Sequence, residues 1–127
     1  MYFLKSFVAL LLFFTCLKAV GQPLISIKDS KNGGYIGKNV SLFQDSSSNM
    51  TFEQVKDMPA LFKRSGVSVP NLGISHSTHW IKFTLTNSSN NEDVVLNLSN
   101  PVIDQACLFL VRSGGGVDSI CYNNKQA

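Results

Sequence analysis

The residues best suited to bind a ligand lie in or next to the segment 80–85, where side chains of opposite faces alternate. A period of two predicts a β-strand, and in it Trp80, Lys82 and Thr84 would share one side. An indole ring beside a lysine and a hydroxyl offers a sugar an apolar platform with polar donors, and His79 is the neighbour of Trp80. We therefore take Trp80, Lys82 and His79 as the candidate ligand surface.

Trp80 also has a structural interpretation, which we favour. Large aromatic side chains are mostly buried, and a helix or a second layer commonly covers a tryptophan in a β-sandwich. The segment that contains Phe52, Leu61 and Phe62 would provide such a cover.

Residues for metal binding or catalysis do not form a recognisable pattern. The two histidines are His76 and His79, and no Cys, Asp or Glu stands beside them at a spacing that suits a metal ion. No nucleophile elbow marks a catalytic triad, and the glycines at 114–116 lie in a predicted hairpin turn rather than between a strand and a helix. We expect a protein that is not an enzyme and that uses no cofactor.

Cys107 and Cys121 flank a predicted hairpin. If residues 113–115 form a three-residue loop, Arg112 faces Gly116 and Cys107 faces Cys121, which is close enough for a cross-strand disulfide. A shift of one residue in register would separate the two thiols. The alternative is a pair of small buried hydrophobic residues.

The chain has 127 residues, a length that fits one domain. Residues 1–21 have the basic start, the apolar run and the small residues before a cut that are typical of a secretory signal peptide, which leaves 22–127 as the mature domain. An uncleaved anchor is the alternative. Loss of Lys5 and Lys18 leaves 9 of the 11 basic residues against 8 acidic ones, a net charge of +1. So small and dispersed a charge argues against binding to nucleic acid.

The mature chain is patterned mostly for strands. Thr51 and Gln54 are spaced as a capping box and predict one short helix, which Pro59 ends early. In the strand 80–85 we expect Ile81, Phe83 and Leu85 to face the core. The other predicted strands are 24–27, 40–43, 94–98, 106–111 and 117–122. Short strands between turns, without a helix long enough for a crossover, predict an all-β fold, an antiparallel jelly-roll-like β-sandwich.

The last predicted strand, 117–122, has no following partner in the sequence. Because an apolar edge strand is a liability, we expect the chain to be the N-terminal piece of a longer domain.

Several sequence motifs occur in a familiar order. They are Leu72-Gly73, the run Trp80-Ile81-Lys82-Phe83-Thr84-Leu85-Thr86-Asn87, the stretch from Leu96 to Asp104, and Phe109 in an aromatic-bearing strand. In order and spacing these motifs resemble the second type of extracellular domain of bacterial seven-transmembrane receptors with diverse intracellular signalling modules, the 7TMR-DISM extracellular domain 2 family.

The resemblance implies a jelly-roll sandwich on the periplasmic side of a bacterial membrane, similar to carbohydrate-binding modules and sensing a small ligand. It also implies that membrane tethering, through seven transmembrane helices, and any kinase or cyclase output lie in a C-terminal region absent from this chain. The alternative function is a free secreted carbohydrate-binding or adhesion module with a similar sandwich.

Overall fold

Among the residues that the structure describes, the fold consists of short strands with a single short α-helix, as expected for an all-β protein. The computed structural model describes residues 21, 23–27, 34–90, 93–99 and 103–123. The predicted signal peptide, apart from Gly21, lies outside the described residues. In chain order the elements are β1 (Leu24–Ile27), η1 (Gly37–Asn39), β2 (Ser41–Asp45), α2 (Phe52–Lys56), η2 (Pro59–Leu61), β3 (Lys63–Arg64), β4 (Thr78–Lys82), β5 (Thr84–Asn87), β6 (Gln105–Val111) and β7 (Val117–Asn123).

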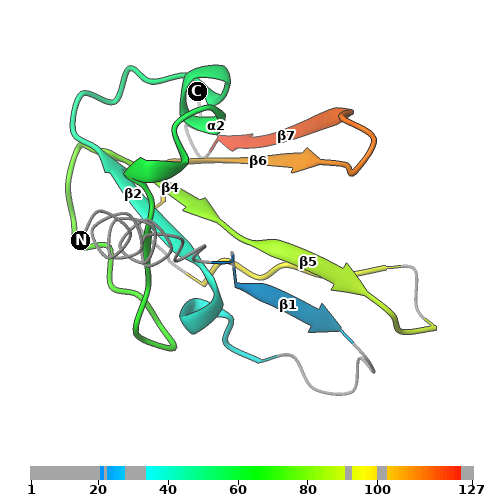
Figure 1. The fold of residues 1–127 in the computed structure, drawn as a ribbon. Helices are drawn as coiled ribbons and strands as arrows, with labels where there is room; N and C mark the ends of the chain where they lie inside the picture. Colours follow the sequence, from blue (N-terminus) through cyan, green and yellow to red (C-terminus); the bar gives the residue numbers. More distant parts are fainter. Residues whose placement is uncertain (1–20, 22, 28–33, 91–92, 100–102, 124–127) are drawn as a thin grey trace, which may run out of the picture.

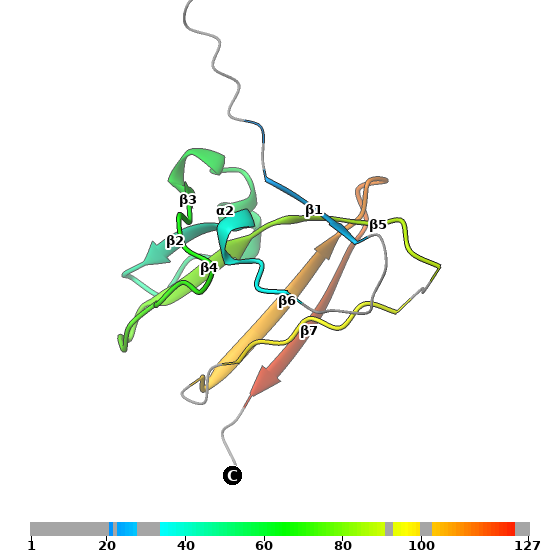
Figure 2. The ribbon, with the colours of Figure 1, turned by 90° about the horizontal axis from the view of Figure 1, so that it is seen from below.

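The strands form three small sheets (Figures 1 and 2). The central sheet has the order β3-β2-β4 and is antiparallel, and the hairpin β6-β7 is antiparallel as predicted. β1 and β5 form the third sheet and are parallel, with Leu24 opposite Thr84, so the prediction of a wholly antiparallel fold was wrong for this pair. A parallel pair needs a long connection, and the elements from η1 to β4 provide it between β1 and β5.

The predicted strand 80–85 is divided at Phe83 into β4 and β5. Of its expected core face, Phe83 is half-buried, but the expectation was wrong for Ile81 and Leu85. Ile81 and Leu85 are 41% and 42% exposed, whereas Trp80 packs against another aromatic ring. The physical reason is the register of β2, which places Phe43 directly opposite Trp80. Two large rings on one face bury more apolar surface than the aliphatic side chains on the other.

Two further expectations about strands failed. Residues 93–99, which include the predicted strand 94–98, are irregular, and Val95 is 90% exposed. A strand needs backbone pairing with another strand, and this stretch pairs with no strand among the described residues. The predicted strand 106–111 is apolar on both faces, which is typical of a central sandwich strand. In the structure, β6 pairs with β7 alone within the described part of the chain, which leaves Leu108 and Leu110 exposed.

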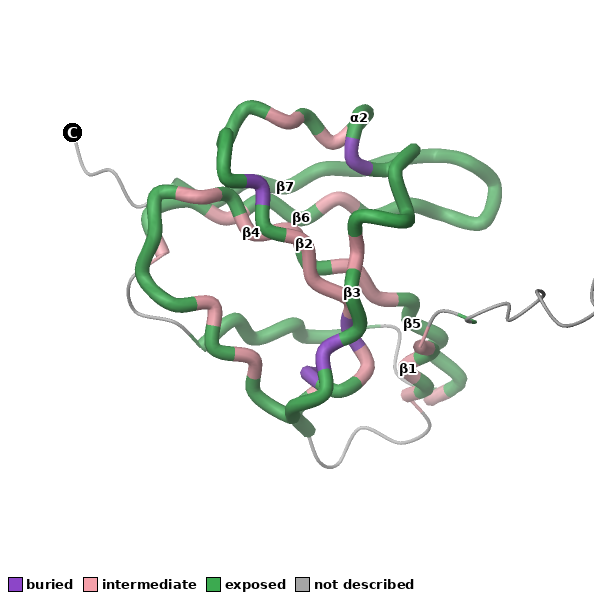
Figure 3. Tube along the Cα trace, turned by 60° about the vertical axis from the view of Figure 1, so that its left-hand side comes forward, coloured by how far each residue is buried: buried purple, intermediate pink, exposed green. Residues whose placement is uncertain are grey.

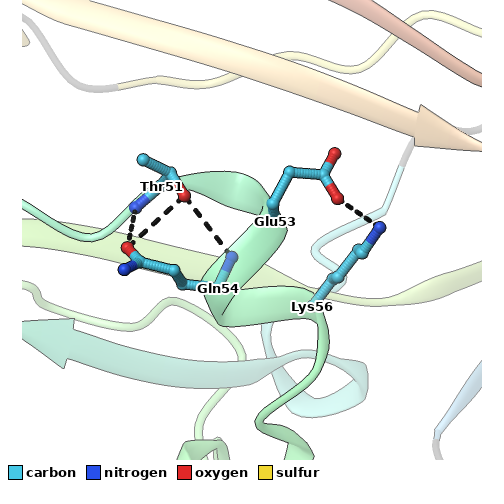
Figure 4. Close-up of polar contacts among 4 residues, drawn as sticks. All are labelled: Thr51, Glu53, Gln54 and Lys56. Atoms are coloured by element: carbon cyan, nitrogen blue, oxygen red, sulfur yellow. Dashed lines mark hydrogen bonds and ion pairs between the residues drawn. The ribbon is translucent and has the colours of Figure 1, made fainter.

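α2 begins with the capping box that the sequence predicts (Figure 4). The backbone N–H of Gln54 donates to Thr51 Oγ1 at 3.4 Å, and the backbone N–H of Thr51 donates to Gln54 Oε1 at 2.9 Å. Glu53 and Lys56 form an ion pair on the outer side of the same turn. Val55, on the inner side, is buried. The capping box thus stabilises a helix of five residues, which is too short to be stable as an isolated peptide.

We expect Thr51→Ala to lower the free energy of unfolding by about 1 kcal/mol, because the N–H of Gln54 loses its acceptor. Urea denaturation followed by circular dichroism measures the change. Thr51→Ser keeps the hydroxyl and should stay within about 0.3 kcal/mol of the wild type. Equal losses in the two variants would contradict a capping role.

The buried residues lie near the two ends of β2 and on α2 (Figure 3). Val40 and Val55 are the buried apolar residues of the described chain, each 3% exposed, and Asp45 and Ser65 are buried polar residues. The backbone N–H of Ser65 donates to Val40 O at 2.9 Å, so β3 continues its pairing with the start of β2. Burial is therefore greatest near the two ends of β2 and on the inner side of α2.

Candidate functional site

One face of the central sheet carries two rows of side chains that run across its strands. Phe43 of β2 lies opposite Trp80 of β4, and its ring centroid is 5.9 Å from that of Phe62, the residue before β3. In the next row Ser41 lies between Arg64 of β3 and Lys82 of β4. An aromatic row and a polar row thus lie side by side on one surface.

Trp80 is held in an aromatic stack that reaches two other elements. Its ring centroid is 6.2 Å from that of Phe109 of β6, with 27° between the planes. Phe109 in turn stacks on Phe52 of α2, at 4.4 Å and 7°. Trp80 Nε1 is buried and has no hydrogen-bond partner among the described residues. These contacts support a structural role for the indole.

The segment expected to cover Trp80 contributes two aromatic rings near it, but the ring that stacks on Trp80 comes from another strand. Phe52 reaches the stack through Phe109, and Phe62 lies in the aromatic row, whereas Leu61 is 37% exposed. Phe109 is the residue that sequence reasoning did not connect with Trp80. Only the packing of the β6-β7 hairpin against the central sheet brings the two rings together.

The three residues of the candidate ligand surface do not share one face. Lys82 lies two residues after Trp80 on β4 and therefore on the same side, with its Nζ 5.5 Å from the centroid of Phe62. His79 points to the other side, where its Nε2 lies 3.3 Å from Ser75 Oγ. The ligand surface stays a prediction, and the geometry favours Lys82 over His79 as its polar member.

The β6-β7 hairpin has the register that its loop predicts. Cys107 is opposite Cys121, and a disulfide joins them. The backbone N–H of Arg112 donates to Gly116 O at 2.8 Å, which closes the loop at the expected residues. Phe109 lies two residues from Cys107 on the same face, so the crosslink holds the strand that presents its ring to Trp80.

Asp45 is a buried carboxylate with a structural function. It accepts from Ser47 Oγ at 2.6 Å, from the N–H of Ser47 at 3.0 Å and from the N–H of Met50 at 3.0 Å. The hydrogen bond from the Ser47 hydroxyl, followed by that from the Met50 amide, lowers the pKa of Asp45 below its usual 3.8. The carboxylate thus stabilises the turn between β2 and α2 through these hydrogen bonds.

This lowered pKa predicts a dependence of stability on pH. A carboxyl whose pKa is lower in the folded state stabilises the fold fully above its unfolded value, here 3.8, and loses that effect as pH falls through the folded value. We expect the melting temperature to fall below about pH 4, and the fall to be smaller in Asp45→Asn. Melts from pH 2 to 6 measure both, and parallel curves for the two proteins would contradict the assignment.

A shallow depression of about 300 Å³ lies beside the polar row and is lined by Lys38, Arg64, Ser65 and Gly66. Arg64 Nε donates to the backbone oxygen of Lys38 at 3.4 Å, which ties β3 to η1 at its rim. Among the residues that the structure describes, no cluster of three or more His, Cys, Asp or Glu side chains suits a metal ion. No helix in that part of the chain is long and apolar enough to cross a membrane.

Comparison with known families identifies the chain. Residues 37–126 match the family 7TMR-DISM extracellular 2, and this match covers more than half of the sequence. The chain belongs to this family. No curated protein and no solved structure matches the sequence.

Membership of the 7TMR-DISM extracellular 2 family means that the chain is an extracellular sensory domain of the kind found in receptors. The matched residues include β2, α2, the strand of Trp80 and the β6-β7 hairpin, so every part of the aromatic stack lies within the family region. The family is one of non-catalytic domains on the outer side of the membrane.

Proposed function

We propose that this chain is the ligand-sensing domain of a bacterial membrane signal-transduction receptor and that it recognises a carbohydrate or a similar small ligand without catalysing a reaction. The match of residues 37–126 to the 7TMR-DISM extracellular 2 family carries the proposal. Binding on the outer side of the membrane would be the input, and any kinase or cyclase activity would belong to another part of the receptor.

The central sheet supports the proposal with a surface suited to a small polar ligand. Its polar row places a hydroxyl, a guanidinium and an ammonium group on one face, and Phe62 contributes an apolar ring next to them. Sugar sites commonly combine such donors with an aromatic face. The aromatic stack of Trp80 lies on the same face, next to these groups.

Thermal melts of the full-length protein with defined oligosaccharides test this function. We would use cellohexaose, xylohexaose, mannohexaose and tri-galacturonate as probes. A probe that binds only the folded state and is present at 100 times its Kd stabilises the protein by about 2.7 kcal/mol, which raises the melting temperature by several degrees. Trp80, the single tryptophan, provides the fluorescence signal. Unchanged melting with every probe would argue against a carbohydrate sensor.

A further inference from the structure

The basic side chains of the described residues fall into two groups. Lys56 binds Glu53 on α2, and Arg112 binds Asp118 across the β6-β7 hairpin. The others have no carboxylate within ion-pair distance among the described residues, and all lie on or beside the central sheet: Lys38, Lys63, Arg64 and Lys82. Positive charge is therefore concentrated at one end of this sheet.

Two of these cations converge on the same face. Arg64 and Lys82 are both opposite Ser41, on either side of β2, so their Cα atoms are roughly 10 Å apart by the usual strand spacing. The Nζ of Lys82 lies over the ring of Phe62, which stands two residues before Arg64. The lysine side chain thus extends across β2 toward the strand that carries Arg64.

Lys38 brings a third cation to this place. It lies in η1, its backbone oxygen accepts from Arg64 Nε, and it lines the same depression as Arg64. Lys63 is the neighbour of Arg64 on β3, and its side chain lies on the opposite face of the central sheet. We call Lys38, Arg64 and Lys82 the basic row.

No carboxylate on the three strands of the central sheet offsets this charge. Asp45 is the one acidic residue of these strands, and it lies four residues from Ser41, roughly 13 Å along β2. Its oxygens already accept from Ser47 and Met50. An anion between Arg64 and Lys82 would relieve the repulsion of the two like charges.

We propose that the basic row binds a carboxylate group of the ligand, so that the domain senses an acidic sugar; this inference rests on the proposed function. The guanidinium of Arg64 can donate two parallel hydrogen bonds to a carboxylate, while Lys82 and Lys38 add positive charge beside it. The ring of Phe62 gives the sugar an apolar face between the two strands.

Calorimetric titration of the full-length protein tests the proposal with tri-galacturonate and its methyl ester, which has the same sugar chain without the charges. We expect the acid to bind at least tenfold more tightly than the ester, and its affinity to fall as sodium chloride is raised. Arg64→Gln and Lys82→Gln should each weaken binding of the acid about tenfold. Lys63→Gln is the matched control and should bind as the wild type does.

Each other outcome has a definite meaning. Equal affinity for acid and ester, with no effect of Arg64→Gln, overturns the proposal and leaves a carbohydrate sensor intact. Binding of a neutral oligosaccharide but not of the acid does the same. Sulfate that displaces tri-galacturonate at equal concentration overturns it too, because the row would then be a general anion site. Unchanged melting temperatures of the variants would show that the losses come from the site and not from unfolding.

Discussion

Trp80→Ala is expected to lower the free energy of unfolding by about 3 kcal/mol, as deletions of large aromatic side chains from packed cores do. The indole packs on Phe109, which stacks on Phe52, so the substitution removes the link between β4, β6 and α2. Denaturation followed by far-ultraviolet circular dichroism measures the loss, since the variant has no tryptophan left to report by fluorescence.

Trp80→Phe is the matched control, because it keeps an aromatic ring for Phe109 and also removes Nε1, which has no partner among the described residues. It should cost less than half as much as the alanine variant. If Trp80 is instead a platform for a sugar, Trp80→Ala will have the melting temperature of the wild type and will lose ligand binding. A stably folded alanine variant without ligand affinity would therefore overturn the structural role.

Gly37→Ala should be comparably damaging for a different reason. A Cβ atom at this position would lie 2.2 Å from the backbone oxygen of Ser68 and 2.6 Å from Cδ of Pro70. The N–H of Gly37 also donates to that oxygen at 3.1 Å, so the two backbones cannot separate without losing a hydrogen bond. We expect a loss of about 2 to 3 kcal/mol, typical of overpacking at a buried site.

Gly66→Ala provides the comparison, because a Cβ atom there would have nothing within 4 Å. Its free energy of unfolding should change by less than about 0.5 kcal/mol. Urea titrations of the two variants and the wild type measure the difference. Similar stability for Gly37→Ala and Gly66→Ala would show that the contact between η1 and the loop at Ser68 is not rigid.

Local features of this fold could be predicted because a few neighbouring residues determine them. The capping box depends on Thr51 and Gln54, and the hairpin register depends on the loop that follows Arg112. Both were confirmed, as was the all-β class. The order and spacing of the motifs around Trp80 also predicted the correct family.

Features that depend on distant pairings could not be predicted in this way. The alternation of Trp80 and Ile81 defines two faces but does not say which is packed, and the outcome depends on Phe43 and Phe109 in other strands. The sequence did not indicate a role for Arg64. Arg64 and Lys82 share a face only because both strands pair with β2 at Ser41. The apolar residues near Leu96 predict a strand, but they pair with no strand among the described residues.

The central claim, that this chain is an extracellular sensory domain, is tested most directly by fusing alkaline phosphatase after Ala127 in a bacterial host. The enzyme needs disulfides that form outside the cytoplasm, as the bond between Cys107 and Cys121 does in an exported protein. We predict an active fusion and an inactive one when residues 1–21 are removed. A full-length fusion that accumulates in cells without phosphatase activity would contradict the claim.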